Sequence, residues 1–327
     1  MKNIDVCALG EVLIDFTPAG TSEKGMPLFE SNPGGAPANV LAAVNKLGGR
    51  SAFIGKIGDD AHGRFLADSM KKSNIDLAGL RIDREIPTTL AFVSLDEKGD
   101  RSFSFYRKPG ADLMLRSAEV DECLLCDCKI FHFGSVSLTG DPARTATLES
   151  AKKAGEAGAL VSYDPNYRPL LWDDDSTAVA EMKKGFELAD IIKVSDYELV
   201  LLTGETDLDK GAEILLGYGA SLVLISMGPG GSYIANKTAS AKLATYDVKT
   251  IDTTGAGDAF LGAILSRLCD KTADEISLLD KSELTDILDY GNACGSLTTT
   301  KTGAAPAIPT PEEIEECRKT VSLMKEA

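Results

Sequence analysis

Apolar and polar positions along the chain follow two alternating patterns. Short runs that are apolar throughout and rich in β-branched residues predict buried strands at 4–10, 51–58, 129–135, 158–165, 190–195 and 221–228. Helix-like stretches lie between and after them, at 36–48, 61–73, 142–157, 176–188, 209–218, 256–269, 283–300 and 311–325. Strands of this kind that alternate with helices predict a mostly parallel sheet covered by helices on both faces. The predicted fold class is therefore α/β.

Two segments do not fit this alternation. Residues 88–107 have the pattern of two alternating strands around the polar turn EKGD, and residues 12–32 are also strand- and turn-like. We expect both segments to return to the same edge of the large sheet and to form a small β-sheet lid. No low-complexity linker, internal repeat or heptad pattern interrupts the chain, so we predict a single domain over residues 1–327 with this lid inserted.

Charge narrows the classes of function. The 327 residues include 34 Lys and Arg against 50 Asp and Glu, a formal net charge of −16. Such a surface repels a phosphate backbone, which argues against general nucleic-acid binding. No run approaches the roughly 18 apolar residues of a membrane span. Acidic residues interrupt residues 1–16, so we interpret this stretch as a first strand rather than a signal peptide and expect a cytoplasmic protein.

The few histidines and scattered cysteines exclude other chemistries. Of the two histidines, His132 stands in an apolar run and is typical of a buried structural residue, which disfavours a Ser-His-Asp hydrolase or a His-rich zinc enzyme. The only cysteine cluster, at 123, 126 and 128, lacks a second pair or a histidine at ligand spacing. We therefore expect seven free thiols in a reducing compartment.

The motif DTTGAGDAF at 252–260 carries the strongest chemical signal. It follows a predicted strand at 244–251 and leads into an apolar helix. Glycines at a helix entry expose backbone N–H groups at the positive end of the helix dipole, which makes an anion pocket without a lysine in the motif. Asp258 is in the first turn, where a carboxylate can simply cap the helix. Beside an anion pocket, however, a carboxylate also suits deprotonation of a hydroxyl that attacks a phosphoryl group.

A second glycine motif, PGGAPANV, occupies residues 33–40. It is not a Walker A loop, because the GK[ST] ending is missing, and the first strand–helix junction lacks the dinucleotide fingerprint G-x-G-x-x-G. Gly34 and Gly35 would let a ligand approach the backbone, and Asn39 offers an amide donor and acceptor, although a plain turn into a helix explains the motif equally well. Residues 53–63 and the MGPGG loop at 227–231 are weak signals when taken alone.

The order and separation of these motifs resemble those of the PfkB (ribokinase-like) sugar kinases. The similarity runs from Ile4 to about Pro311, and within the family it is greatest to the fructokinases. The supporting segments lie at 10–16, 105–115, 131–138, 164–172, 192–199 and 292–310. The resemblance implies a three-layer ribokinase-like fold with a lid, and transfer of the γ-phosphoryl group of ATP to the 6-hydroxyl of fructose.

The resemblance also assigns roles to the residues of the two main motifs. Asp258 would be the general base, and the backbone N–H groups of Gly255, Ala256 and Gly257 would stabilise the developing phosphate charge. Sugar hydroxyls would be bound by Asp15, Gly34, Gly35 and Asn39. Arg107 and Arg168 would close over the substrate or steer the phosphates. The lid would exclude water when substrate binds, and because family members often pair through it, we expect a homodimer.

Nucleotide and ion sites follow from the same resemblance. The expected nucleotide contacts are Lys193, Ser226, Gly228, Gly230, Gly231 and Asn292. Magnesium in this family is arranged around an N-x-x-E motif, of which Glu198 is retained while Ser195 replaces the Asn; Asn166 would help through water. A potassium site would use the region of Asp252, Thr254, Thr298, Lys301 and Gly303, although a cluster of strand-end carbonyls is equally consistent with no ion.

Other functions remain open from the sequence. A 2-keto-3-deoxygluconate kinase would bind the carboxylate of its substrate with Arg107 and Arg168, but both arginines also fit a fructokinase, and the segments at 164–172 and 194–199 favour fructose. A nucleoside kinase is disfavoured because only 6% of the chain is aromatic. A non-catalytic sugar-binding protein would be expected to lose Asp258 or the glycine run. A Rossmann oxidoreductase would need the missing fingerprint.

Overall fold

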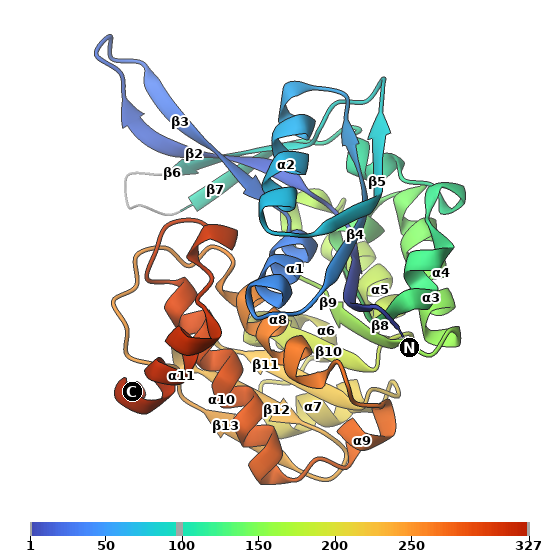
Figure 1. The fold of residues 1–327 in the computed structure, drawn as a ribbon, viewed down its shortest axis with the longest axis vertical. Coiled ribbons are helices and arrows are strands. Elements are labelled where there is room, and N and C mark those ends of the chain that lie inside the picture. The colour runs from blue at the N-terminus through green and yellow to red at the C-terminus, as the bar shows by residue number, and fades with distance from the viewer. Residues whose placement is uncertain (1, 96–100, 326–327) are drawn as a thin grey trace.

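The computed structural model describes residues 2–95 and 101–325. In these ranges nine strands form a large sheet and four form a smaller one (Figure 1). The order across the large sheet is β13 (Ser240–Leu243), β12 (Ser232–Ala235), β11 (Leu222–Ser226), β10 (Ile191–Ser195), β9 (Leu160–Asp164), β8 (Cys128–Gly134), β1 (Ile4–Leu9), β4 (Ser51–Gly58) and β5 (Asp76–Asp83). The strands from β11 to β5 are parallel, whereas β12 and β13 form an antiparallel edge.

Helices cover both faces of the large sheet, which gives the three layers that the sequence predicts. The helices of the described ranges are α1 (Ala36–Lys46), α2 (Ala61–Lys72), α3 (Glu122–Asp127), α4 (Ala143–Glu156), α5 (Asp175–Phe186), α6 (Asp196–Thr203), α7 (Leu208–Leu216), α8 (Ala256–Leu268), α9 (Ala273–Ser277), α10 (Lys281–Thr298) and α11 (Pro311–Thr320). Along β1, Val6 packs into the core under α1 and α8, while Cys7 packs into the opposite core under α4 and α5. Because successive side chains of a strand face opposite cores, these strands are apolar throughout.

The smaller sheet is built from the two segments that do not fit the α/β alternation. Its order is β3 (Pro27–Gly34), β2 (Leu13–Thr21), β6 (Leu90–Leu95) and β7 (Arg101–Tyr106), which confirms strands in both predicted segments. The polar turn expected at 97–100 lies outside the described residues. Phe16 and Phe92 stack with ring centroids 4.7 Å apart, and Phe29 and Tyr106 pack edge-on against Phe92. This aromatic cluster stabilises a sheet that has little core of its own.

Two predicted elements are wrong. No strand forms over 244–251, where Tyr246 makes only an isolated bridge to Leu323. The last helix ends at Thr320 instead of 325, because the chain after it runs back to make this bridge, with the Met324 N–H donating to the Thr245 carbonyl. The strands β5, β12 and β13 and the short helices α3, α6 and α9 are additional to the prediction.

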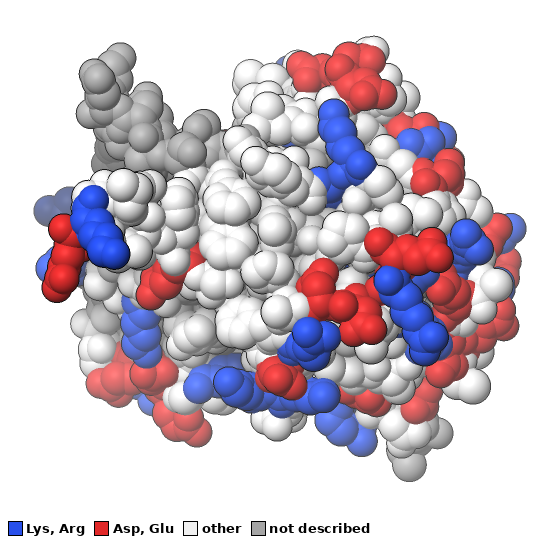
Figure 2. All heavy atoms as spheres, turned by 90° about the horizontal axis from the view of Figure 1, so that it is seen from above, with Lys and Arg blue, Asp and Glu red and all other residues white. Residues whose placement is uncertain are grey.

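The histidine, cysteine and surface-charge predictions can be compared with the structure. His132 lies buried in β8 with its Nδ1 3.1 Å from the Ser162 hydroxyl, and burial lowers its pKa to about 3. All seven cysteines are free. Figure 2 shows Lys and Arg side chains interspersed with Asp and Glu on one face of the molecule. Across residues 2–95 and 101–325, no helix has the length and apolar character needed to cross a membrane.

Candidate active site

The carboxyl ends of the parallel strands meet at one edge of the large sheet, and most of the predicted site residues lie there. Asp164 ends β9, Ser226 ends β11, and Lys193 stands two residues before the end of β10. In open α/β sheets the crevice beyond these strand ends is the usual place for a ligand. Helix α8, which carries the DTTGAGDAF motif, begins beside this edge, since Gly257 lies next to Lys193.

The start of α8 requires glycine at 255. Gly255 has φ 74°, and a Cβ added there would lie 2.4 Å from the Ala304 Cβ and 2.9 Å from its Cα. The helix follows at once, with the Ala259 N–H donating to the Gly255 carbonyl at 2.8 Å. First-turn N–H groups have no partner inside their own helix, although Ala256 donates a long bond of 3.3 Å to Thr253. The turn thus presents backbone donors at the positive end of the α8 dipole.

A hydrogen bond joins the two glycine motifs. The Asn39 Nδ2 donates to the Asp258 Oδ2 at 2.8 Å, although the two residues are 219 positions apart. Helices α1 and α8 can cross this closely because of Gly262, where a Cβ would lie 2.6 Å from the Ala43 Cβ. Burial raises the pKa of Asp258, while the bond from Asn39 and the charge of Lys193 act in the opposite direction. A carboxylate with a raised pKa is suited to accept a proton.

Lys193 brings a positive charge to the start of α8. Its Nζ donates to the Asp164 Oδ2 at 2.7 Å in a buried ion pair. A Cβ added to Gly257 would lie 3.4 Å from the same Nζ, so the ammonium group stands beside the first turn of α8. Burial alone would lower the pKa of Lys193, but the carboxylates of Asp164 and Glu198 outweigh it and the pKa is raised. The lysine therefore remains charged next to the backbone donors.

The Asp15 carboxylate on β2 lies against Gly34 on β3, although the strand register pairs Asp15 with Asn32 and Gly34 with Leu13. A Cβ on Gly34 would lie 2.1 Å from the Asp15 Oδ2, so glycine is what allows the carboxylate to occupy this position. Burial raises the pKa of Asp15 to about 6, and the charge of Arg168 opposes the rise. Arg168 also lowers the pKa of Asp258. The charge of this one exposed guanidinium thus acts on both Asp15 and Asp258.

Arg107 is placed differently from Arg168. It is buried, and its Nε and Nη2 both contact the Asp112 carboxylate at 2.7 Å. Its Nη1 donates to the Thr139 hydroxyl and its Nη2 also donates to the Val136 carbonyl. These contacts hold the base of the small sheet to the large one. The structure therefore leaves Arg168 exposed, with its charge acting on Asp15 and Asp258, but engages Arg107 in internal contacts.

The predicted nucleotide residues surround the hairpin between β11 and β12. Gly228 and Gly230 are exposed in the connecting 3-10 turn, while a Cβ on Gly231 would lie 2.0 Å from the Leu243 carbonyl oxygen. Asn292 is buried on α10, where its Oδ1 accepts from the Ser232 hydroxyl at 2.6 Å and its Nδ2 donates to the Ala244 carbonyl. Asn292 thus anchors the hairpin through its side chain, whereas Gly228 and Gly230 at the hairpin tip are exposed.

The residues expected around metal ions are only partly together. Glu198 forms a capping box with Ser195 and also accepts the Tyr167 N–H at 2.6 Å, so both of its oxygens are engaged. Asp252 accepts from the Thr254 N–H and hydroxyl and from the Gly303 N–H. The two other residues expected at the potassium site have different partners. The Thr298 hydroxyl donates to the Cys294 carbonyl, and the Lys301 ammonium lies 3.6 Å from the Glu313 carboxylate.

A residue that the sequence prediction missed supports the second glycine motif. Glu11 is only 4% exposed, and its Oε1 accepts the N–H of Ala36, the first residue of α1, at 3.0 Å. The neighbouring Gly35 has φ 118°, and a Cβ there would lie 2.5 Å from the Glu11 carbonyl oxygen. The only signal in the sequence was an acidic residue next to Gly10, directly after a buried strand.

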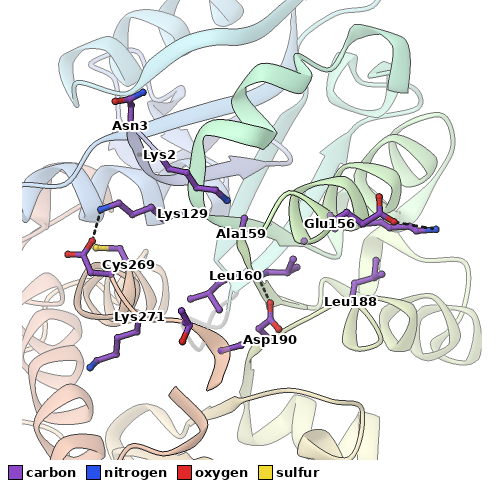
Figure 3. A pocket seen from close by; sticks show the side chains of 18 of the residues that line it. Lys2, Asn3, Lys129, Glu156, Ala159, Leu160, Leu188, Asp190, Cys269 and Lys271 are labelled. Carbon is purple, nitrogen blue, oxygen red and sulfur yellow. Dashed lines mark hydrogen bonds and ion pairs between the residues drawn. The ribbon is translucent and has the colours of Figure 1, made fainter. Parts of the chain in front are cut away.

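A separate cavity of about 1000 Å³ opens at the opposite, amino-terminal edge of the large sheet (Figure 3). Lys129 is tied there to Asp5 and Asp270, and the Asp190 carboxylate accepts the Val161 N–H. None of the predicted site residues lines this cavity.

Comparisons with known proteins show the family of the chain. The sequence model described as "pfkB family carbohydrate kinase" matches residues 3–311. The chain belongs to the PfkB family of carbohydrate kinases. Fructokinase-2 of Solanum habrochaites is 44% identical over 311 residues, which cover 94% of each chain. The probable fructokinase-3 of Arabidopsis thaliana is 45% identical over 308 residues, which cover 93% of this chain and 88% of that protein.

Solved structures of fructokinases confirm the predicted fold. A fructokinase of Xylella fastidiosa with bound ATP is 35% identical, with a TM-score of 0.89 and coverage of 96% of this chain and 98% of that chain. A fructokinase double mutant of Vibrio cholerae O395, with bound fructose, ADP and potassium ion, is 31% identical, with a TM-score of 0.84 and coverage of 97% and 99%. The chain is thus a carbohydrate kinase that is similar to fructokinases from plants and bacteria.

Proposed function

We propose that this PfkB kinase transfers the γ-phosphoryl group of ATP to the 6-hydroxyl of fructose. The observation that carries the proposal is the 2.8 Å hydrogen bond from Asn39 to Asp258. It joins the motif expected to bind sugar with a carboxylate in the first turn of α8. The fructokinase relatives and the ATP-bound structure of the Xylella fastidiosa fructokinase support both substrates.

In the proposed reaction Asp258 takes the proton of the attacking hydroxyl. The sugar oxygen forms a bond to the γ-phosphorus as the bond to the β–γ bridging oxygen breaks, so ADP leaves and the proton stays on the carboxylate. The raised pKa of Asp258 increases its basicity. Backbone N–H groups of Gly255, Ala256 and Gly257, with the α8 dipole and the Lys193 ammonium, offset the charge that develops on the phosphoryl oxygens. The nucleotide would extend over the β11–β12 hairpin, with Ser226 and Gly228 to Gly231 near it.

The sugar would lie between the small sheet and the start of α8. Asp15, the Gly34–Gly35 backbone and the Asn39 amide offer paired acceptors and donors for hydroxyl groups. Arg168 is exposed and acts on both carboxylates, so it is placed to close over a bound substrate. The small sheet would then serve as a lid that excludes water from the transfer.

Magnesium fits this site as an ion held largely by ATP phosphates and water. In the part of the chain that the structure describes, no group of three or more His, Cys, Asp or Glu side chains could hold a metal. Glu198 has both oxygens engaged and would reach the ion through water, with help from Asn166, which is how Mg²⁺ commonly binds beside phosphates. The ion would neutralise phosphate charge. A potassium ion would lie near Asp252, Thr254 and Gly303.

The position of Arg107 favours fructose over 2-keto-3-deoxygluconate. Recognition of a substrate carboxylate would need an available guanidinium fork, and the fork of Arg107 is already occupied by Asp112. Arg168 alone remains of the two arginines considered for this role.

A panel of sugars tests the proposal. Purified protein with MgATP is assayed for ADP release with fructose, glucose, ribose, 2-keto-3-deoxygluconate and a nucleoside, and the product of the best substrate is analysed by ³¹P–¹H NMR. We expect the highest kcat/KM with fructose and a phosphate on C6. A clear preference for another sugar would overturn the substrate assignment, and phosphate on C1 would overturn the position of transfer.

The Asp258→Asn variant is the matched control for the same assay, because it keeps the size and a hydrogen-bonding group but cannot take a proton. We expect its kcat to fall by about three orders of magnitude or more, while the Kd for ADP measured by calorimetry stays within about twofold. Near-normal turnover by this variant would contradict the role of Asp258 as the base.

A further inference from the structure

Glu11 is a buried carboxylate in the three-residue connection between β1 and β2, where the chain passes from the large sheet to the small one. It is 4% exposed. Its Oε1 accepts the Ala36 N–H at 3.0 Å, whereas its Oε2 is buried and has no hydrogen-bond partner in the described structure. A buried carboxylate with an unpartnered oxygen is costly. Its position therefore calls for an explanation.

The contacts of Glu11 lead to the proposed base in three steps. Ala36 begins α1, and the preceding Gly35 has a φ that glycine favours and leaves no room for a Cβ beside the Glu11 carbonyl oxygen. The Asn39 N–H donates to the Gly35 carbonyl at 3.1 Å, and the Asn39 side chain donates to Asp258. The Glu11 carboxylate thus fixes the turn that aims Asn39 at Asp258.

Charge alone does not account for Glu11. The charged groups that act on it are Arg107, after β7, and Asp112, in the 3-10 turn at Ala111–Met114. These two are already paired with each other at 2.7 Å. Burial is the largest effect and raises the pKa of Glu11 to about 7. The residue therefore does not serve mainly as a partner for Arg107, and its defined contact is the amide of Ala36.

We propose that Glu11 is a positioning residue for phosphoryl transfer, which holds the Gly34–Asn39 turn through the Ala36 amide and so sets the geometry of Asn39 and Asp258. The inference rests on the proposed role of Asp258 as the base. It deepens that role by naming the group that orients the partner of the base. A misplacement of about 1 Å in such a partner is enough to lower turnover about a hundredfold.

Three variants at this position separate positioning from packing. Glu11→Gln keeps an oxygen acceptor for Ala36, Glu11→Met fills a similar volume without an acceptor, and Glu11→Asp keeps a carboxylate with a shorter reach. The matched control is Asp190→Ala, at the opposite edge of the sheet. Asp190 also accepts one backbone N–H, from Val161 at 2.8 Å, and burial also raises its pKa.

Each variant is assayed with the sugar that the wild type phosphorylates best, so the test does not depend on that sugar being fructose. Thermal melting is measured for every variant. For Glu11→Met we expect kcat to fall at least about tenfold and the KM for sugar to rise, with the KM for ATP within about twofold. Glu11→Gln should recover kcat to within about threefold, and Asp190→Ala should lower the melting temperature without this split in the kinetic constants.

Several outcomes would overturn the proposal. It fails if Glu11→Met is folded and turns over normally, if Asp190→Ala shows the same kinetic split, or if Glu11→Gln is as slow as Glu11→Met. Should Glu11→Met not be recovered in folded form, Glu11→Asp decides, because it is expected to show the same split and normal turnover would contradict the inference. The Asp258→Asn variant is run alongside. If that variant stays active, the proposed base is wrong, whereas loss of activity there with no effect at Glu11 refutes only the positioning role.

Discussion

The hydrogen bond between Asn39 and Asp258 affects both the pKa and the orientation of the Asp258 carboxylate. Asn39 lowers the pKa of a carboxylate that burial raises, so the bond limits how basic Asp258 becomes. It also engages the Oδ2 of Asp258, so that in the proposed reaction the other oxygen would accept the proton of the substrate hydroxyl. The amide thus both orients and moderates the proposed base.

Replacing Asn39 by Ala should therefore shift the pH profile. Without the bond the pKa of Asp258 rises, and because Asp258 acts in its deprotonated form, the acid limb of kcat/KM should move to higher pH. The measurement is kcat/KM for fructose between pH 5 and 9 for both proteins. An unchanged acid limb, with only a uniform loss of rate, would show that Asn39 does not tune the base.

Glu11 predicts a dependence of stability on pH with a definite sign. Burial raises the pKa of Glu11 in the folded protein to about 7 from its ordinary value of 4.5, with Arg107 opposing and Asp112 reinforcing the rise. The folded state then holds its proton more tightly than the unfolded state between these values. The contribution of the protonated Glu11 side chain to the stability of the folded protein is fully present below about pH 4.5 and is lost as the pH rises through about 7.

Gln at position 11 does not ionise, so the free energy of unfolding of Glu11→Gln should increase relative to that of the wild type as the pH rises. The gain approaches about 3 kcal/mol between pH 4.5 and 8. Urea unfolding of both proteins at pH 5 and pH 8 measures it. A constant difference between the two proteins would mean that Glu11 titrates as an ordinary exposed carboxylate.

Among the elements, the parallel strands next to the site and the helices α1 and α8 were predictable from the sequence, because buried strands and helices leave strong patterns of apolar residues, whereas the short α6 and β12 were missed. The edge strands β12 and β13 have four residues each, and β5 is half exposed, so their patterns were too weak. The glycine motifs located Asp258 and Asn39. Their mutual contact, the role of Glu11 and the pairing of Arg107 with Asp112 depend on how distant segments pack, which periodicity does not report.

Helix packing supplies a test of the spacing between α1 and α8. A Cβ on Gly262 would lie 2.6 Å from the Ala43 Cβ and 2.8 Å from the Val40 carbonyl oxygen. We expect Gly262→Ala to push the helices apart, to cost about 1–3 kcal/mol of stability and to lower kcat by separating Asn39 from Asp258. Chemical denaturation and steady-state kinetics measure both effects.

The control for this change is Gly155→Ala on α4, whose Cβ would meet only the Val161 Cγ2 at an ordinary 3.5 Å. A helical glycine replaced by alanine without a clash should gain up to about 1 kcal/mol of stability and keep full activity. If both variants behave alike, the close crossing of α1 and α8 has no special importance.

For the molecule as a whole, the small sheet is the surface on which we expect the two copies of a dimer to meet. Leu28 and Phe29 on β3 are 45% and 42% exposed, and Tyr106 at the end of β7 is 66% exposed. Apolar side chains gathered on one sheet favour association. Sedimentation equilibrium should therefore give a dimer for the wild type and a shift towards monomer for Leu28→Glu.

The matched control is Ile82→Glu, because Ile82 is 61% exposed on β5 at the edge of the large sheet. The Ile82→Glu variant should have the same molecular mass in sedimentation equilibrium as the wild-type dimer. A wild-type monomer, or an equal response to both substitutions, would contradict a dimer through the small sheet.

The separation of 219 positions between Asn39 and Asp258 also bears on when the enzyme becomes active during its synthesis. A ribosome that has made the first two hundred residues has produced the motif at 33–40 and much of the parallel sheet, but not the proposed base. Contacts between segments so far apart in sequence form late and slowly. A nascent chain would therefore not transfer phosphate from ATP before α8 has packed against α1. The onset of kinase activity in a translation reaction would then report the completion of folding.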